Sequence, residues 1–369
     1  MRILITGGAG FVGSSLALML KRDRPDAVVC AFDNLRRRGS ELALARLKGA
    51  GVEFVHGDVR SPDDLTEVGP FDLLLECSAE PSVHAGYAGN PAYVLQTNLN
   101  GTIHCLDAAR RHTADFIFLS TSRVYPIERL RGLPLEVRGG RLDIPRQASG
   151  IGWSHRGIAS EFPLAGYRSL YGATKLASEL IIDEYRAMYG MRTIVNRCGV
   201  ISGPWQMGKV DQGFVVLWAA RHLYGGSLTY SGFGGEGFQV RDVLHVADLY
   251  DLLRTEMTGM ARLSGAVFNV GGGFDNSVSL AELTALCRSR AGASIPIEPK
   301  PDTSEADVPY YVSDNVAVTA STGWSPQRTI DVILDDIFAW LQEHRATLEP
   351  LLGVPAAASR PHTELPASS

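Results

Sequence analysis

The sequence has few cysteines, no marked charge imbalance and no long hydrophobic run, and each shortage excludes a class of protein. Its five cysteines are scattered without a C-x-x-C pair, which argues against a secreted disulfide framework and favours reduced thiols in a cytoplasmic protein. The 35 basic and 40 acidic side chains nearly balance, unlike in a nucleic-acid-binding protein. No apolar run reaches the roughly 18 residues of a membrane span, so we expect no membrane partner. The nine histidines form no cluster, so we expect no metal site.

Glycine is the one residue type in excess, with 39 of 369 residues, against an average of roughly 7%. Four glycines lie in T-G-G-A-G-F-V-G (Thr6–Gly13), after an expected strand and at the start of an expected helix. Its G-x-G-x-x-G pattern is typical of a loop whose backbone N–H groups bind a pyrophosphate at a helix N-terminus. Asp33 follows Gly13 by 20 residues. A carboxylate there can bind the ribose hydroxyls of NAD and repels the 2′-phosphate of NADP.

Two neighbouring features bear on the same cofactor. Arg36, Arg37 and Arg38 follow Asp33, and arginines near this position can accommodate a 2′-phosphate, so NADP stays an alternative to NAD. Asp58-Val59, after the third expected strand, stands where an adenine edge can be bound. A cap at the end of that strand is the alternative.

Short apolar runs alternate with helical patterns along much of the chain. Such alternation predicts βαβ units with a parallel sheet, and near-continuous apolar strands indicate a sheet covered on both faces. The predicted fold class is therefore α/β: a Rossmann-type doubly wound parallel sheet with a smaller, mostly C-terminal α/β substrate-binding domain. The expected strands are Ile3–Thr6, Val28–Phe32, Val52–His56, Phe71–Leu75, Phe116–Leu119, Thr193–Arg197 and Ala266–Val270, and the expected helices are Phe11–Lys21, Ser40–Leu47, Pro62–Glu67, Ala92–Arg111, Leu170–Tyr189, Val246–Thr258, Ser279–Arg290 and Ile330–His344.

Breaks in this alternation predict the domain organisation. We expect an NAD-binding Rossmann domain in residues 1–200 and a substrate-binding region in residues 201–350 that is partly interleaved with it. The first domain carries an insertion at 126–169, and a segment of that length is functional, disordered or folded as small elements over a site. Residues 203–239 are irregular and rich in glycine and aromatic residues. Residues 353–369 are rich in Ala, Ser and Pro, which predicts a disordered tail.

Tyr171 and Lys175 form Y-x-x-x-K on an expected helix, where a spacing of four puts both on one face. A phenol with a pKa near 10 is a poor base at neutral pH, but a cationic lysine one turn away favours the phenolate. Thr121 ends the fifth expected strand, at the sheet edge where ligands bind, and can share a proton with Tyr171. A surface pair and a turn-capping hydroxyl are the alternatives.

In these features the chain resembles the extended short-chain dehydrogenases/reductases of the nucleotide-sugar epimerase and dehydratase type. The likeness covers about residues 1–345 and rests on the glycine loop, S-T-S-R-V-Y (Ser120–Tyr125), Y-G-A-T-K (Tyr171–Lys175) and Q-V-R-D-V-L-H (Gln239–His245). The stretches similar to CDP-tyvelose (CDP-paratose) 2-epimerases are F-D-N-L-R-R-R-G-S-E (Phe32–Glu41), G-K-V-D-Q-G-F (Gly208–Phe214), Q-V-R-D-V-L-H and F-N-V-G-G-G…N-S-V-S-L (Phe268–Leu280).

The resemblance implies a set of site residues. The implied catalytic residues are Thr121, Tyr171 and Lys175. The implied substrate-binding residues are Thr121 and Arg241, since a guanidinium suits a pyrophosphate; a salt bridge to an acid such as Asp242 is the alternative for Arg241. The implied NAD-binding residues are Gly7, Gly10, Phe11, Val12, Gly13, Asp33, Asn34, Asp58, Val59, Ser78, Ala79, Asn98, Ser120, Tyr171 and Lys175.

Four positions depart from the wider pattern. Val200 replaces a common asparagine, and Ser304 replaces an arginine. Ser122 and Arg123 stand where the related 4,6-dehydratases carry Asp-Glu. Because removing water from a sugar needs an acid and a base, this departure disfavours dehydration.

The sequence therefore predicts an NAD-dependent epimerase of a nucleotide-activated sugar that acts at carbon 2 through a transient keto intermediate and hydride return. The alternatives are a carbon-4 epimerase or a 4,6-dehydratase on another nucleotide sugar, and a non-catalytic NAD-binding regulator. The resemblance also implies a homodimer or homotetramer formed through the helices at Ala92–Arg111 and Leu170–Tyr189.

Overall fold

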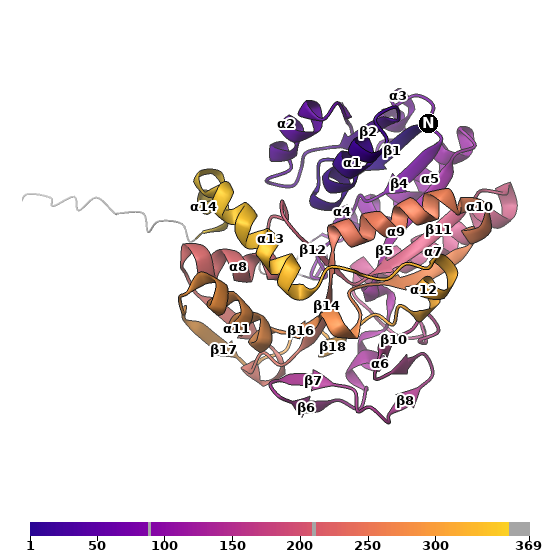
Figure 1. The fold of residues 1–369 in the computed structure, drawn as a ribbon. Coiled ribbons are helices and arrows are strands. Elements are labelled where there is room, and N and C mark those ends of the chain that lie inside the picture. The colour runs from indigo at the N-terminus through magenta and orange to yellow at the C-terminus, as the bar shows by residue number, and fades with distance from the viewer. Residues whose placement is uncertain (88–89, 209–211, 354–369) are drawn as a thin grey trace, which may run out of the picture.

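A parallel sheet of seven strands forms the centre of the molecule (Figure 1). The structure is a computed structural model and describes residues 1–87, 90–208 and 212–353. The strand order is β15-β11-β5-β4-β1-β2-β3, and every pairing in the sheet is parallel. The strands are β1 (Arg2–Thr6), β2 (Val28–Asp33), β3 (Glu53–His56), β4 (Leu73–Glu76), β5 (Asp115–Thr121), β11 (Thr193–Cys198) and β15 (Ala266–Val270).

Helices cover both faces of this sheet. Ile3, Leu4 and Ile5 of β1 are fully buried because successive side chains of a strand point to opposite faces, and both faces are covered. Ile3 and Ile5 pack on one side and Leu4 on the other. The helices of the first side are α1 (Phe11–Asp23), α2 (Glu41–Gly49), α9 (Val246–Thr258), α10 (Met260–Leu263) and α12 (Val316–Thr322), and those of the second are α3 (Pro62–Glu67), α5 (Gly101–Arg111) and α7 (Leu170–Tyr189). The doubly wound α/β fold is confirmed.

Helix α7 carries the predicted catalytic pair, and its ends follow from its sequence. The Ser169 hydroxyl accepts a hydrogen bond from the Gly172 N–H at 3.3 Å, which caps the first turn. Gly190 ends the helix in the left-handed conformation, with φ of 67°. Tyr171 therefore lies in the first turn, and Lys175 lies one turn further along the same face.

The expected helix at Ala92–Arg111 is present but not uniform. It consists of α4 (Ala92–Leu95), a π-helical turn, η1 (Gln96–Asn100), and α5. The wider turn contains Asn98, whose side chain leaves the helix to bind backbone elsewhere.

The C-terminal half adds a second layered unit, which Figure 1 shows beside the main sheet. Its strands are β12 (Val200–Ser202), β14 (Val240–His245), β16 (Ser277–Ser279) and β18 (Tyr310–Tyr311), with β13 (Leu228–Ser231) paired to β17 (Ile297–Lys300). Its helices are α8 (Phe214–Tyr224), α11 (Leu280–Ala291), α13 (Ile330–Glu343) and α14 (Arg345–Leu352), with 3₁₀ turns η3 (Phe233–Gly235) and η4 (Phe274–Asn276). Since β15 and α9 come from beyond residue 201 yet join the first unit, the two units interleave.

The expectation that residues 203–239 are irregular is wrong for α8. Six consecutive residues, Val215–Ala220, are buried because α11, α13 and α14 surround the helix. A helix that is apolar all round lacks the 3.6-residue pattern by which a half-exposed helix is recognised.

The insertion at 126–169 is folded as small elements, one of the three alternatives. These are α6 (Ile127–Arg131), β6 (Glu136–Arg138), β7 (Arg141–Asp143), β8 (Ser149–Gly150), β9 (Trp153–Ser154) and β10 (Gly157–Ile158), after a 3₁₀ turn, η2 (Ser122–Val124). Ile127 and Ile158 pack with Val240 and Tyr310 of the C-terminal unit. The insertion therefore packs against the region around β14 and β18.

Part of the chain lies outside the described residues. The predicted tail falls there from residue 354 onward, and so do residues 209–211 of the G-K-V-D-Q-G-F stretch. Within the described ranges, no helix is both long and apolar enough to cross a membrane.

Candidate active site

A cavity of about 1330 Å³ lies at the carboxyl edge of the sheet and extends to the C-terminal unit. β1 and β4 are neighbours at this edge, where the strand order changes direction, and α/β sheets bind ligands at such a point. The predicted site residues that line the cavity are Gly7, Gly10, Phe11, Val12, Gly13, Asp33, Asn34, Val59, Ser78, Ala79, Thr121, Tyr171 and Arg241.

The glycine loop has the shape that a dinucleotide pyrophosphate needs. Gly7 has a φ of 63°, in the left-handed region. A Cβ atom on Gly13 would lie 2.2 Å from the Gly7 carbonyl oxygen, so no other residue fits there without a shift. Gly10 precedes the first turn of α1 and lines the cavity. The N-terminus of α1 is thus open toward the cavity, and this chain fits the pyrophosphate of NAD.

Asp33 lies beside the loop, at the end of β2. Its carboxylate accepts hydrogen bonds from the Ala9 N–H at 3.1 Å and the Leu35 N–H at 2.7 Å. Burial raises the pKa of Asp33, and these backbone hydrogen bonds act against that rise. They fix the carboxylate at the cavity wall, where it suits a ribose diol.

Asp58 does not line the cavity, but it holds a residue that does. The Asn34 side-chain amide donates to the Asp58 carboxylate at 2.8 Å, and Arg60 pairs with the same carboxylate at 2.6 Å. Burial acts to raise the pKa of Asp58, but the hydrogen bonds of Arg60 and Asn34 lower it to about 2. Asp58 is therefore anionic at neutral pH.

Asn98, Ser120 and Lys175 also lie behind the cavity wall. Asn98 accepts a hydrogen bond from the Glu80 N–H at 2.7 Å and donates to the Glu80 carbonyl at 3.0 Å, which fixes the loop after β4. The Ser120 hydroxyl donates to the Glu179 carboxylate. In this structure, Asn98 and Ser120 position their neighbours.

Tyr171 is buried at the cavity wall next to Thr121. Burial raises the pKa of the Tyr171 phenol, and the hydrogen bond with Thr121 and the charge of Arg123 act in the opposite direction. Lys175 lies one turn further along α7 and is 2% exposed. Its Nζ lies 4.1 Å from the centroid of the Phe118 ring. The lowering of the Tyr171 pKa by Lys175 stays a prediction.

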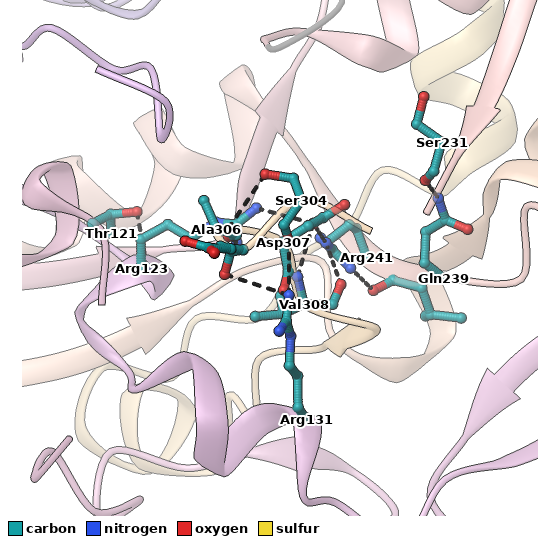
Figure 2. A network of polar contacts seen from close by, with 12 residues as sticks. Thr121, Arg123, Arg131, Ser231, Gln239, Arg241, Ser304, Ala306, Asp307 and Val308 are labelled. Carbon is teal, nitrogen blue, oxygen red and sulfur yellow. Dashed lines mark hydrogen bonds and ion pairs between the residues drawn. The ribbon is translucent and has the colours of Figure 1, made fainter. Parts of the chain in front are cut away.

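Arg241, on β14, pairs with a residue that sequence reasoning missed (Figure 2). Its guanidinium donates to the Asp307 carboxylate at 2.9 Å and the Val308 carbonyl at 2.7 Å. The alternative of a salt bridge to an acid is thus present in this structure, but the acid is Asp307. Asp242 does not form it, and its carboxylate accepts backbone hydrogen bonds, including that of Ser313 at 3.1 Å. Burial lowers the pKa of Arg241 to about 10, so it is cationic at neutral pH.

Two more arginines reach the segment that carries Asp307. Figure 2 shows Arg123 and Arg131 approaching it from the η2 turn and α6. Arg123 donates to the Ala306 carbonyl at 3.2 Å, and Arg131 donates to the Ser304 carbonyl at 2.7 Å. Arg123 and Arg241 line the cavity, whereas Arg131 is not among its lining residues.

The cavity is cationic, although the whole chain carries a formal charge of −5. Among the described lining residues, eight are Lys or Arg and four are Asp or Glu. Sequence reasoning missed Arg46, Arg221 and Lys300, which come from α2, α8 and β17 and share no motif. A positive lining is the complement that phosphorylated ligands require.

Gln239 is a further lining residue without an assigned role. It is 7% exposed, and its amide nitrogen donates to the Ser231 carbonyl at 3.0 Å. Its Oε1 has no hydrogen-bond partner among the described residues. A buried acceptor without a hydrogen-bond partner suits a ligand that presents an N–H or O–H group.

Sequence and fold are similar to those of proteins of known family. The sequence pattern of the "NAD dependent epimerase/dehydratase family" matches residues 3–271. A CDP-paratose 2-epimerase from Salmonella typhi is 30% identical over 92% of this chain and 99% of its own length. A dTDP-glucose 4,6-dehydratase from Streptomyces griseus is 30% identical over 96% of this chain and 98% of its own. A solved dTDP-glucose 4,6-dehydratase from Streptomyces venezuelae, with NAD bound, has a TM-score of 0.75 and 27% identity, and covers 95% of this chain and 100% of its own.

Proposed function

Because the chain belongs to the NAD dependent epimerase/dehydratase family, we propose that it is an epimerase that inverts carbon 2 of a CDP-activated sugar of the paratose/tyvelose kind. One observation carries the proposal: a buried tyrosine forms, together with Thr121, part of the wall of a cationic cavity beside a dinucleotide loop. The chain spans nearly the whole length of the relative with this activity.

In this proposal, NAD supplies the hydride acceptor and donor when it is bound. The Tyr171 phenolate oxygen takes the proton of the carbon-2 hydroxyl, while the hydrogen on carbon 2 leaves with its electron pair. Thr121, which lines the cavity beside Tyr171, orients the same substrate oxygen. The resulting ketone reorients so that its opposite face receives the hydride. Its oxygen then regains the proton from Tyr171. The reaction has no net oxidation and consumes no water.

Arg123 favours epimerisation over dehydration. Removing water from a sugar requires groups that exchange protons near neutral pH, and a guanidinium does not. Arg123 lines the cavity two residues after Thr121, where the resemblance implies that 4,6-dehydratases carry an acidic residue. A cation at this position cannot act as the acid or the base of an elimination. It therefore favours epimerisation through the keto sugar over loss of water.

Gln239 favours a cytosine nucleotide. Its amide nitrogen is engaged by Ser231, so the group that it offers a ligand is the acceptor oxygen. Cytosine presents an exocyclic amine donor, whereas uracil and thymine present a carbonyl oxygen at the same ring position. A cytidine diphosphate therefore satisfies the buried oxygen.

A screen of CDP-, GDP-, UDP- and dTDP-activated sugars, read by NMR and mass spectrometry, tests the proposal. We expect a CDP-sugar to give a product of unchanged mass with inverted carbon 2. A product lighter by one water would instead identify a dehydratase. Inversion at carbon 4 would identify the other epimerase, and tight NAD binding without turnover of any sugar would favour the regulator.

Arg241 provides a binding test with a matched control. Arg241→Ala is expected to weaken CDP binding about 10- to 100-fold, because it removes a charge-assisted hydrogen bond to phosphate. Arg131→Ala removes a guanidinium that holds the same backbone segment from outside the cavity wall. Calorimetry should find that Arg131→Ala changes the affinity for CDP only slightly. Equal losses in both variants would mean that Arg241 acts only by holding that segment.

We also propose that two copies associate through α7 and the neighbouring α4–α5 region. Leu180 and Met188 of α7 are large apolar side chains that are 65% and 67% exposed, and Leu95 of α4 is 37% exposed. A second copy that presents the same helices covers all three. Analytical ultracentrifugation measures the resulting mass.

A further inference from the structure

Glu76 is a buried carboxyl group that the proposed mechanism does not use. It ends β4 and is 0% exposed. Its Oε1 accepts hydrogen bonds from the Thr102 hydroxyl at 3.0 Å and the Ser78 hydroxyl at 3.3 Å. Its Oε2 has no hydrogen-bond partner among the described residues. Burying a carboxylate with two neutral donors is costly unless a cation compensates it.

The cation on the same face of the sheet as Glu76 is Lys175. Glu76 and Phe118 are register partners in β4 and β5, so both side chains extend from the same face of the sheet. The Lys175 Nζ lies over the Phe118 ring on that face, and the lysine is 2% exposed. The charge of Lys175 is the largest that stabilises ionised Glu76, and the charge of Glu76 is the largest that stabilises ionised Lys175.

Other ionisable groups around this pair do not take the place of Glu76. Three thiols lie near it, Cys77 directly after β4, Cys105 on α5 and Cys198 on β11, and burial raises the pKa of each so that they are neutral at neutral pH. Glu179 lies one turn beyond Lys175 on α7, but its carboxylate pairs with Arg197 at 2.7 Å. Among the described residues, Glu76 is therefore the carboxyl available to balance the lysine.

We propose that Glu76 is a positioning residue that keeps Lys175 protonated and directs its ammonium within the buried site. The proposal rests on the proposed function only in so far as turnover uses Lys175. Burial alone disfavours a charged lysine. Without the Glu76 carboxylate, the lysine would lose its proton at a lower pH, and a neutral lysine cannot support the Tyr171 phenolate.

The experiment compares Glu76→Gln with Glu76→Asp and the wild type. Because the chain has only five lysines, ¹⁵N-lysine NMR can follow the Lys175 Nζ, with Lys175→Met for assignment. In the ligand-free protein we expect Glu76→Gln to shift this titration by about 1–3 pH units toward acid. Glu76→Asp, which keeps the charge but sets it back by one methylene, should show a smaller shift in the same direction. The alkaline limb of the kcat profile should move in the same direction as the Lys175 titration.

Glu256→Gln is the matched control, since Glu256 is also 0% exposed and pairs with one neutral side chain, Asn196, at 2.9 Å. It should leave the Lys175 titration unchanged. An unchanged titration in Glu76→Gln, or the same shift in the control, would overturn the proposal. If Glu76→Gln does not fold, Glu76→Asp takes its place, and a wild-type titration in that variant would overturn the proposal equally. Because the NMR arm needs no substrate, failure of the proposed function leaves it intact.

Discussion

Replacing Tyr171 with phenylalanine is expected to lower turnover by about 10²–10⁴-fold, the contribution typical of a general acid–base group. The substitution removes the single oxygen that takes and returns the substrate proton. The ring stays, and its buried surroundings at the first turn of α7 are kept. NAD affinity and thermal stability should therefore stay close to those of the wild type.

Tyr167→Phe is the matched control, because Tyr167 lies four residues earlier and is 54% exposed. Steady-state kinetics with the substrate found in the screen, together with calorimetry of NAD binding, separates chemistry from binding. Near-wild-type turnover in Tyr171→Phe would contradict the mechanism.

Replacing Glu179 with alanine is expected to lower the free energy of unfolding by about 3–5 kcal/mol. The Glu179 carboxylate pairs with Arg197 at 2.7 Å, and the two side chains are 5% and 7% exposed. Arg197 also donates to the Tyr125 hydroxyl at 3.2 Å. Removing Glu179 leaves a buried guanidinium without its counter-charge.

Asp183→Ala, one turn further along α7, is the control for this effect. Asp183 pairs with Arg186 at 2.8 Å, but these side chains are 68% and 39% exposed. Exposed pairs contribute about 0–1 kcal/mol. Urea unfolding of both variants should give losses that differ severalfold. Equal losses would mean that the buried pair is not a stabilising element of α7.

The features that the sequence predicted well are local. The glycine loop lies between a strand and a helix, and Asp33 ends the next strand, so chain order alone brings them together. Y-x-x-x-K likewise needs only the helical period. The family resemblance supplied Thr121 and Arg241, which line the same cavity although 120 positions separate them.

The features that it missed depend on tertiary packing. The expected fourth strand stops at Leu75, yet β4 continues through the buried Glu76. Its surroundings, the Thr102 and Ser78 hydroxyls and Lys175 above Phe118, come together only in the folded chain. The partner of Arg241 is Asp307, which lies 66 positions away and belongs to no motif. No period or spacing in one sequence reveals such pairs.

The central claim is that the hydride removed from carbon 2 returns to the same carbon of the same sugar. A CDP-sugar labelled with deuterium at carbon 2, incubated with the enzyme in ordinary water, tests this claim most directly. We predict that NMR will find the epimerised product with deuterium retained at carbon 2. Epimerised product that has lost the deuterium to water would contradict the account.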